Sequence, residues 1–347
     1  MQVSENIPLA PLTTLGVGGP ARYFVEGRSA DEVRAAVDWA RDRGLQLFVL
    51  GGGSNLLVAD HGFHGLVLKI AIGGIEQHKE ESKDIFEVGA GEAWDAFVAH
   101  AVARNCGGIE CLSGIPGMVG GTPVQNVGAY GQEVSATIHA VQVLDMQTGQ
   151  VRELCNPSCQ FEYRSSIFNT TERGRYIILR VSFALQAAGS PRLAYADLKN
   201  YFGGRTATLA ETREAVLRIR QSKGMLIVEG DEDCRSAGSF FKNPVLSAPE
   251  YAALLERAAN RNLTVPAYPA LAAQHKIAAA WLVEHSGFCK GYTRGPVGIS
   301  SKHALAIVNR GGATAADVIA LKDEIQTAVA EQWGVTLHPE PVMLGFE

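Results

Sequence analysis

The stretch LSGIPGMVGGTPVQNVGAYG, residues Leu112–Gly131, decides how this chain folds. It has glycine at six positions, proline at two, and no charged side chain. Glycine costs roughly 1 kcal/mol per helical position relative to alanine, and proline about 3 kcal/mol, so this stretch cannot be a helix. Apolar side chains such as Leu112, Val119 and Val127 distinguish it from a polar linker. We therefore expect an ordered, winding backbone with few Cβ atoms on its surface.

A backbone of this kind can form one wall of a ligand site. Glycine lets the main chain approach a ligand closely, and successive N–H groups form concavities that bind anions. The stretch is therefore consistent with a site for a pyrophosphate and a flat ring. A cluster of glycine-rich turns between strands explains the same pattern equally well, so the stretch alone leaves both interpretations open.

The bulk composition limits the class of protein. A chain of 347 residues predicts two or three domains, and 46% hydrophobic with 19% charged residues is typical of a soluble protein with a large core. A formal net charge of −5 gives no indication of a nucleic-acid partner. No apolar run approaches the about 18 residues of a transmembrane helix, and the N-terminus lacks the features of a secretory signal. We expect a cytoplasmic protein with no membrane partner.

The cysteine pattern predicts no metal site. The chain has six cysteines and no C-x-x-C pair. Cys155 and Cys159 are separated by three residues, but no histidine lies close by to complete a zinc site. Buried or incidental thiols in a reducing compartment explain the pattern better.

A second glycine-rich loop follows a short apolar segment. The segment Leu45–Leu50 predicts a buried strand, and it leads directly into GGGSN, residues Gly51–Asn55. A strand that ends in a glycine turn is a common arrangement for binding phosphate. No Gly-Lys-Ser/Thr follows, so this is not a Walker loop. Together with Leu112–Gly131 it suits two phosphates, or a phosphate and a ring.

The remaining pattern indicates an α+β protein. The first half alternates short strands with few helices, and the last third contains helices next to a small sheet. Capping boxes predict helices that begin at Ser29 and at Thr314, and Lys276–His285 predicts a strongly apolar helix. The acidic stretch Gly230–Arg235 is interpreted as a solvated loop. The G-x-G-x-x-A pattern from Gly16 is followed by an extended segment instead of a helix, so no dinucleotide fingerprint is predicted there.

Three polar residues could carry chemistry. Arg164 follows Tyr163 in FEYRSSIFN, and its permanent charge requires an anionic partner, which an internal carboxylate could also supply. Ser239 in AGSFFKNP has no nucleophile elbow around it, and it could be a proton donor or a turn serine. Glu340 in LHPEPV is held between two prolines, and it could be a buried acid or an exposed turn residue.

Taken together, five motifs resemble one family. LGGGSN, IPGMVGGTPVQNVGAYG, YRSSIF, AGSFFKNP and HPEPV occur in this order and span nearly the whole chain. The chain resembles the UDP-N-acetylenolpyruvoylglucosamine reductases (MurB), flavoenzymes of peptidoglycan precursor synthesis. The YADL segment around Tyr195 resembles the tyrosine loop of the type I branch of that family.

The resemblance implies a fold and a domain division. It implies an α+β protein with an FAD-binding domain of the vanillyl-alcohol oxidase/p-cresol methylhydroxylase type, which has two subdomains, and a smaller α+β substrate-binding domain. The expected boundaries are residues 1–70 with 334–347 for the first FAD-binding subdomain, 71–222 for the second, and 223–333 for the substrate-binding domain.

The resemblance also implies a reaction in two halves. NADPH reduces FAD, and the flavin N5 hydride then passes to the vinyl carbon of UDP-N-acetylglucosamine enolpyruvate, which gives UDP-N-acetylmuramate. It implies that Ser239 donates the proton and that Arg164 and Glu340 stabilise the enolate. We expect a monomer whose partners are NADPH and the sugar nucleotide.

The resemblance implies binding roles for two further groups of residues. The expected FAD-binding residues are Gly51, Gly52, Gly53, Ser54, Asn55, Ile115, Pro116, Gly117, Gly120, Gly121, Thr122, Pro123, Asn126, Gly128, Ala129 and Tyr130. The expected substrate-binding residues are Tyr163, Tyr195, Lys223, Asn243 and His285. Two features depart from the family pattern. The segment of residues 224–237 is longer than the corresponding segment in the family. His285 stands where glutamine is common, which favours packing at a helix end for this side chain.

Two other functions remain open at this point. One is an FAD-dependent oxidase of the same superfamily, although an oxidase needs no proton donor for an enolate. The other is a non-catalytic protein that binds flavin or a sugar nucleotide.

Overall fold

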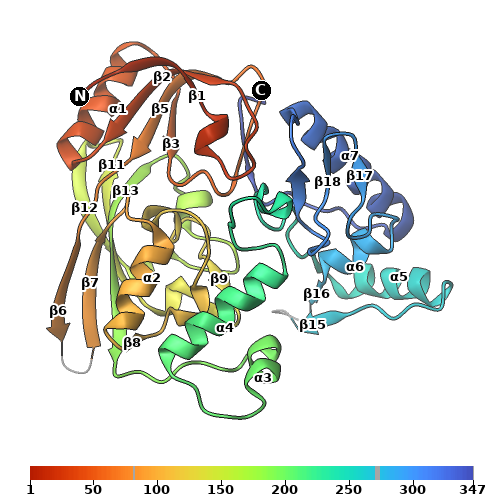
Figure 1. Cartoon of the computed structure of the whole chain (residues 1–347). Coiled ribbons are helices and arrows are strands. Elements are labelled where there is room, and N and C mark those ends of the chain that lie inside the picture. The colour runs from red at the N-terminus through yellow and green to blue at the C-terminus, as the bar shows by residue number, and fades with distance from the viewer. Residues whose placement is uncertain (81–82, 270–273, 347) are drawn as a thin grey trace. The chain divides into compact units, whose positions relative to one another are not determined.

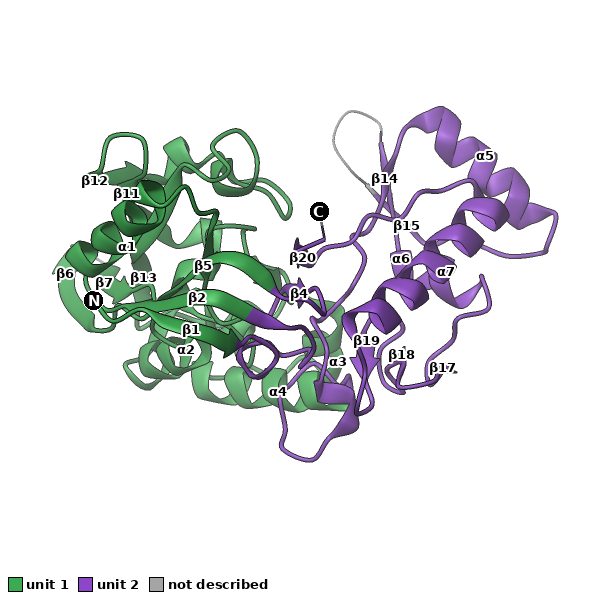
Figure 2. Cartoon of the chain, turned by 90° about the horizontal axis from the view of Figure 1, so that it is seen from above, with its two compact units in different colours: residues 1–7, 21–53, 63–222 green, residues 8–20, 54–62, 223–347 purple. Residues whose placement is uncertain are grey.

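The computed structural model describes residues 1–80, 83–269 and 274–346. The chain forms two compact units, each built from three separate stretches (Figure 2). Unit 1 comprises Met1–Ile7, Ala21–Gly53 and Phe63–Ser222, and unit 2 comprises Pro8–Pro20, Ser54–Gly62 and Lys223–Glu347. Unit 1 therefore contains both of the glycine-rich stretches, except for Ser54 and Asn55.

The described part of unit 1 combines two larger sheets and the short β9–β10 pair with four α-helices (Figure 1). Its strands are β1 (Ser4–Pro8), β2 (Pro20–Gly27), β3 (Leu47–Leu50), β5 (Phe63–Ile70), β6 (Ile75–Glu80), β7 (Lys83–Gly89), β8 (Cys106–Gly107), β9 (Gly128–Ala129), β10 (Gln132–Glu133), β11 (Ile138–Asp145), β12 (Gln150–Cys155) and β13 (Tyr176–Ala187). Its helices are α1 (Ala30–Asp42), α2 (Trp94–Ala103), α3 (Ala196–Phe202) and α4 (Leu209–Ser222).

The two larger sheets of unit 1 differ in the relative direction of their paired strands. The first has the order β1-β2-β5-β3, in which β5 pairs parallel with both β2 and β3. The second has the order β12-β11-β13-β7-β6, with antiparallel pairs throughout. β2 and β3 lie on either side of β5 and both run parallel to it, and the segment between them contains α1, the crossover that parallel strands of one sheet require.

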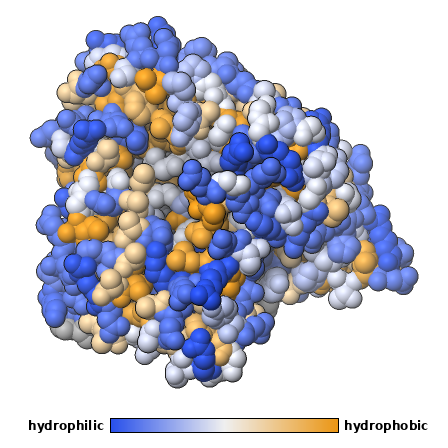
Figure 3. All heavy atoms as spheres, in the orientation of Figure 1, coloured by the Kyte–Doolittle hydropathy of each residue, from blue (hydrophilic) through white to orange (hydrophobic). Residues whose placement is uncertain are grey.

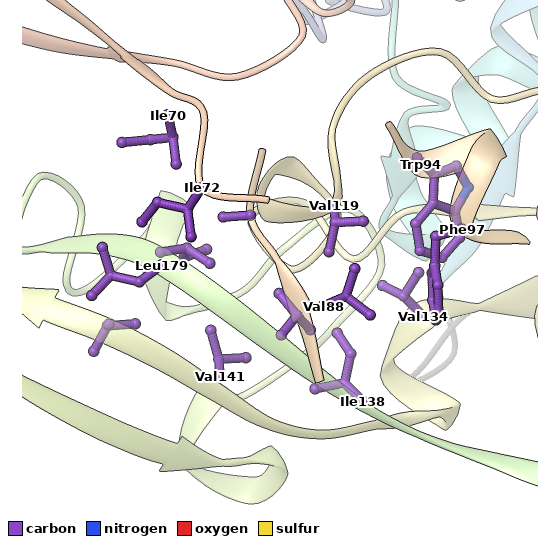
Figure 4. Packing of buried hydrophobic residues seen from close by; sticks show 14 of the residues in the cluster. Ile70, Ile72, Val88, Trp94, Phe97, Val119, Val134, Ile138, Val141 and Leu179 are labelled. Atoms are coloured by element: carbon purple, nitrogen blue, oxygen red, sulfur yellow. The ribbon is translucent and has the colours of Figure 1, made fainter. Parts of the chain in front are cut away.

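One large cluster of buried side chains stabilises unit 1. It includes Trp94 and Phe97 of α2 and Val88 of β7 (Figure 4). Val119, from the middle of the glycine-rich stretch, and Val134 belong to the same cluster. The apolar residues of the stretch therefore anchor it in the core, and the predicted ordered, winding backbone is confirmed.

A second, smaller cluster of buried side chains packs between α3 and α4. It joins Leu198 and Phe202 of α3 to Ala215 and Val216 of α4, and it includes Cys111. This short helix and the segment before it are therefore packed on α4 and on the start of the glycine-rich stretch.

Unit 2 is an α+β unit with its own core. Its strands are β4 (Leu56–Val58), β14 (Val245–Leu246), β15 (Ala267–Pro269), β16 (His275–Ile277), β17 (Thr293–Arg294), β18 (Val297–Ile299), β19 (Ile307–Asn309) and β20 (Val342–Leu344). Its helices are α5 (Ala248–Ala259), α6 (Ala279–Glu284) and α7 (Ala315–Trp333). Leu15, Leu57 and Leu337 are fully buried in one cluster, so residues from all three stretches of unit 2 share its core.

The longest helix of unit 2 begins where the sequence predicts. Thr314 and Asp317 form the predicted capping box of α7, and Gly334 ends the helix in a left-handed conformation with φ +68°. The Asp60 carboxylate also accepts hydrogen bonds from the N–H groups of Ala315 (2.7 Å) and Ala316 (3.0 Å). This contact ties a distant loop to the positive end of the helix.

The helix predicted over Lys276–His285 is wrong in its first part. Residues His275–Ile277 form β16, which pairs with β14 and β15, and α6 begins only at Ala279. Asn243 fixes this start, because its Oδ1 accepts a hydrogen bond from the N–H of Ala279 at 2.9 Å. Pairing with distant strands has overridden the local helical pattern.

The acidic stretch Gly230–Arg235 is also more than a solvated loop. Asp233 is 5% exposed and accepts hydrogen bonds from the N–H and hydroxyl of Ser301, at 2.9 and 2.6 Å. Asp231 forms an ion pair with Lys302 at 2.5 Å. The stretch is therefore fixed to another loop of unit 2, a contact that local sequence does not encode.

The predicted capping box of α1 forms only in part. Ser29 accepts a hydrogen bond from the N–H of Glu32 at 3.2 Å, as predicted. The Glu32 carboxylate accepts from the N–H of Arg28 instead of from Ser29. The helix is still capped, so its predicted start is confirmed.

The described surface has mixed polarity. On the face drawn in Figure 3, hydrophobic residues lie in small groups among hydrophilic ones. Within the residues that the structure describes, no helix has the length and hydrophobicity needed to cross a bilayer.

Candidate active site

The two glycine-rich loops of unit 1 meet. We call residues 51–53 and 112–131 the glycine wall. A Cβ placed on Gly52 would lie 2.6 Å from the Cα of Gly117, which is shorter than real Cβ contacts. Only glycine at position 52 allows the two main chains to approach this closely. The predicted pairing of the two loops is therefore present in the structure.

Main-chain hydrogen bonds fix the wall to its neighbours. The N–H of Trp94 donates to the carbonyl of Gly117 at 3.0 Å, and the N–H of Gly120 donates to the carbonyl of Ala90 at 2.9 Å. The Trp94 indole N–H donates to the carbonyl of Leu112 at 3.0 Å. The wall is thus attached to the end of β7 and the start of α2, both of which pack in the core.

A partly exposed ion pair ties the wall to α4. Asp95 accepts from the N–H of Gly114 (2.5 Å) and forms two parallel hydrogen bonds with Arg213 (2.5 and 2.8 Å). Burial alone would raise the pKa of Asp95, but the hydrogen bonds from Arg213 and Gly114 and the charge of Arg213 outweigh it, so the pKa is lowered. Asp95 is therefore ionised when it holds the wall at neutral pH.

The glycines of the wall fall into two classes. At Gly52 and Gly120 a Cβ would meet protein atoms at 2.6 and 2.7 Å, so the fold itself requires glycine. At Gly51 and Gly121 a Cβ would meet nothing within 4 Å, and neither residue has a left-handed φ. The fold does not require glycine at these two positions. A ligand that lies against the main chain does require it, so the wall fits the pyrophosphate and ring of FAD.

Two non-glycine residues of the wall have left-handed backbones. Asn126 has φ +45° and Tyr130 has φ +48°. Asn126 is buried, and its side-chain amide donates to Glu133 (3.1 Å) and to the carbonyl of Glu162 (3.0 Å). Thr122 is also buried, and its hydroxyl donates to the carbonyl of Val119 at 2.8 Å. The hydrogen bonds of these two buried side chains hold the backbone of the wall in its conformation.

The structure places Arg164 against the wall. Its guanidinium donates to the carbonyl of Gly128 at 2.9 Å and lies over the ring of Tyr163, with Cζ 5.3 Å from the centroid. Its φ is +56°, a conformation that costs a non-glycine residue energy and that is concentrated at functional sites. Asn169 stabilises this turn by donating to the carbonyl of Arg164 at 3.1 Å.

Tyr195 also lies near the wall. It stands immediately before α3, and its ring makes an edge contact with the ring of Tyr130, with centroids 5.5 Å apart. Tyr195 is 45% exposed.

Unit 2 brings Ser239 and Glu340 together. The N–H of Glu340 donates to the carbonyl of Phe240 at 2.9 Å, and the N–H of Lys242 donates to the carbonyl of His338 at 3.0 Å. We call residues 239–242 and 338–340 the serine–glutamate strand pair. Phe240 is fully buried, whereas Ser239 and Glu340 are half-buried. Residues about a hundred positions apart in sequence thus become neighbours.

The predicted FAD-binding residues divide between the units. Gly51, Gly52 and Gly53 belong to unit 1, whereas Ser54 and Asn55 belong to unit 2. The Asn55 amide donates to the carbonyl of Glu340 at 3.2 Å, so this residue supports the serine–glutamate strand pair.

The other predicted substrate-binding residues of unit 2 occupy separate positions. Lys223 is the first residue of the last stretch of unit 2. Asn243 caps α6, as described above. His285 lies at the C-terminal end of α6 and stacks on Trp281, with centroids 4.4 Å apart. This is the helix-end packing that the sequence favours for His285.

Comparisons with known proteins identify the family. A family model described as UDP-N-acetylenolpyruvoylglucosamine reductase, C-terminal domain, matches residues 230–344, and one described as FAD binding domain matches residues 21–154. The UDP-N-acetylenolpyruvoylglucosamine reductase of Thermobifida fusca is 47% identical over 99% of this chain and 98% of its own length. The chain belongs to the UDP-N-acetylenolpyruvoylglucosamine reductase family. The reductase of Streptomyces coelicolor is similar at 46% identity, over 99% of this chain and 91% of its own.

A solved structure of the family covers the same length. The crystal structure of UDP-N-acetylenolpyruvylglucosamine reductase from Thermus caldophilus aligns with a TM-score of 0.67 at 27% identity, over 99% of both chains. The predicted α+β fold with an FAD-binding domain of the vanillyl-alcohol oxidase/p-cresol methylhydroxylase type is confirmed. The chain is an FAD-containing oxidoreductase, and the cofactors of its family are FAD and NADPH.

Sequence reasoning missed several residues that shape the site. Asp95 and Arg213 hold the wall to α4, and Glu110 is a fully buried carboxylate just before the wall. Glu110 had a usable signal, because an acid between Ile109 and Cys111 in a strongly apolar segment requires an internal hydrogen-bond partner.

Proposed function

We propose that this chain reduces UDP-N-acetylglucosamine enolpyruvate to UDP-N-acetylmuramate with NADPH as the reductant, and that Arg164, Ser239 and Glu340 act on the substrate. One observation carries the assignment of residues. Arg164 is held in a left-handed conformation with its guanidinium against Gly128 of the wall that fits FAD. The family of the chain supports the reaction itself.

FAD, when bound, would supply the hydride for this reaction. When a hydride adds to an enolpyruvyl group, negative charge develops on the carboxylate as an enolate. The permanent charge of Arg164 offsets it, and the pairing of the guanidinium with Gly128 fixes the position of that charge in advance.

Ser239 holds the proton that completes the reduction. A serine hydroxyl is a weak acid, so it transfers a proton only to a strongly basic carbon and only where water is excluded. Phe240 and Phe241, at 0% and 2% exposure, follow Ser239 directly in the sequence and make its surroundings apolar. The carboxyl group of Glu340 polarises the same substrate group from the adjoining strand.

The remaining predicted residues would bind the two ligands. The open glycines Gly51 and Gly121 would allow the main chain to contact FAD, and Tyr195, Lys223 and Asn243 would contact the sugar nucleotide. We propose the domain division as two FAD-binding subdomains, residues 1–70 with 334–347 and residues 71–222, and a substrate-binding domain, residues 223–333. We further propose that the protein is a cytoplasmic monomer with no nucleic-acid or membrane partner.

The test is the dependence of NADPH oxidation on the sugar nucleotide. The purified protein should carry nearly one flavin per chain by its absorbance spectrum and should oxidise NADPH only when UDP-N-acetylglucosamine enolpyruvate is present. Steady NADPH oxidation with oxygen alone would favour the oxidase instead. A yellow protein that oxidises no NADPH under either condition would favour a binding protein.

A further inference from the structure

A buried carboxylate holds the segment that leads to Tyr195. Glu110 is 0% exposed, and its oxygens accept hydrogen bonds from three directions. Gly108 donates its N–H at 2.7 Å, Gln132 donates its side-chain amide at 2.7 Å, and Arg192 donates its N–H at 3.0 Å. A charge removed from water in this way is retained only where it is well hydrogen-bonded.

The contact at Arg192 involves both of its main-chain groups. The N–H of Arg192 donates to the Glu110 carboxylate. The carbonyl of Arg192 accepts a hydrogen bond from the thiol of Cys111, the residue after Glu110, at 3.4 Å. Cys111 in turn is fixed by its own N–H, which donates to Gln132 at 2.8 Å. Two consecutive residues immediately before residues 112–131 of the glycine wall thus clamp one residue of a distant segment.

The clamped segment has no regular secondary structure. Between the end of β13 at Ala187 and the start of α3 at Ala196, the chain forms neither helix nor strand. Arg192 lies in this connection, three residues before Tyr195. Its clamped main chain therefore sets where the connection leaves the body of unit 1 and where the ring of Tyr195 reaches the wall.

We propose that Glu110 is a positioning residue for Tyr195, acting through the main chain of Arg192. The proposal rests on the proposed function, in which Tyr195 contacts the sugar nucleotide. Glu110 touches neither substrate nor cofactor in this role. It holds the tyrosine at the correct distance from the wall, so its loss weakens substrate binding and leaves the reduction of the flavin by NADPH unchanged.

The sharpest variant leaves the buried carboxylate in place. Arg192→Pro removes the N–H that donates to Glu110, and Arg192→Ala keeps it, so the two differ at the proposed contact. We expect Arg192→Pro to raise the KM for the sugar nucleotide about tenfold, the loss expected for one hydrogen bond to a charged group. We expect Arg192→Ala to behave as the wild type, and the rate of flavin reduction by NADPH to be the same in all three proteins.

A double-mutant cycle separates positioning from general stability. If Glu110 acts through Tyr195, Arg192→Pro should have no further effect on KM in a Tyr195→Ala background. Glu110→Gln should resemble Arg192→Pro in its effect on KM, and it should speed hydrogen exchange of the Arg192 N–H, which donates to Glu110. An equal effect of Arg192→Pro with and without Tyr195, or an equal fall in the rate of flavin reduction, would overturn the proposal.

The same experiment distinguishes failure of the function from failure of the contact. If the wild type does not oxidise NADPH with the sugar nucleotide, the proposed function fails and with it the role of Tyr195. The exchange rates then still report whether the Glu110 contact holds the segment. Unchanged exchange of the Arg192 N–H in Glu110→Gln would show that it does not.

Discussion

The glycine wall in unit 1 and the serine–glutamate strand pair in unit 2 are built in opposite ways. The wall comes mostly from one continuous stretch, in which six of twenty residues are glycines without a side chain. The strand pair joins residues about a hundred positions apart, and main-chain hydrogen bonds hold its two segments together. The wall is suited to contact with a cofactor, and the strand pair is suited to chemistry on a substrate.

This difference indicates which substitutions each region tolerates. The wall depends on volume, because adding one carbon atom at Gly52 creates an overlap with Gly117. The strand pair depends on the identity of two side chains, while its backbone is secured by hydrogen bonds that any residue except proline could make. Substitutions should therefore affect binding and folding in the first region and turnover in the second.

The largest expected effect tests the strand pair. Ser239→Ala should leave the reduction of the flavin by NADPH intact and slow its reoxidation by the sugar nucleotide by at least 10²–10⁴-fold, the usual contribution of a proton donor. Stopped-flow absorbance of the two half-reactions measures both rates. Normal reoxidation in this variant would remove Ser239 from the chemistry.

A nearby serine provides the control for this variant. The hydroxyl of Ser236 accepts a hydrogen bond from the N–H of Gly238 at 3.3 Å, so it belongs to the same segment. Ser236→Ala should reoxidise at close to the wild-type rate. If both variants lose reoxidation equally, the loss belongs to the conformation of the segment and not to a proton.

An intermediate effect tests the two classes of glycine in the wall. Gly52→Ala forces an overlap at 2.6 Å and should destabilise the protein by about 1–3 kcal/mol, with loss of bound flavin. Gly51→Ala meets no protein atom and should keep the apoprotein within about 1 kcal/mol of the wild type, while it also loses flavin. Thermal melting of the apoprotein and the ratio of flavin to protein absorbance measure the two effects.

Variants at Gly51 and Gly121 test whether the wall contacts the cofactor. Gly121→Ala should behave as Gly51→Ala does, because its Cβ also meets nothing within 4 Å. If both variants bind flavin as well as the wild type, glycine at these positions serves no ligand, and the wall is a cluster of turns.

The smallest expected effect is the pH dependence of the attachment between the wall and α4. The pKa of Asp95 is lowered in the folded protein, so its ionised form stabilises the fold above the unfolded-state pKa of about 3.9. That stabilisation is lost as the pH falls through the lowered folded-state pKa. Asp95→Asn should cost about 1 kcal/mol at pH 7, a value limited by solvent screening, and the difference from the wild type should shrink below about pH 4.

Chemical denaturation between pH 3 and pH 7 measures this difference. Asp42→Asn is the matched control, because Asp42 lies exposed at the end of α1. A constant difference between Asp95→Asn and the wild type across the whole range would contradict the role of the ionised carboxylate.

Much of the site could be predicted from sequence, but only as separate parts. The glycine content of Leu112–Gly131, the glycine turn after Leu45–Leu50 and the arginine in an aromatic segment each stand out locally. Their spatial relations do not. The contact of Gly52 with Gly117 and the pairing of Phe240 with Glu340 join positions 65 and 100 residues apart.

Local preference therefore determined the elements that depend only on near neighbours. It made the wall non-helical, because glycine and proline disfavour a helix, and it set both ends of α7 through Thr314 and Gly334. Tertiary structure alone decided that α6 begins at Ala279, that Asp233 is buried, and that Glu110 holds Arg192. The physical reason is that each of these depends on a hydrogen-bond partner supplied by a remote part of the chain, which only the folded protein brings within reach.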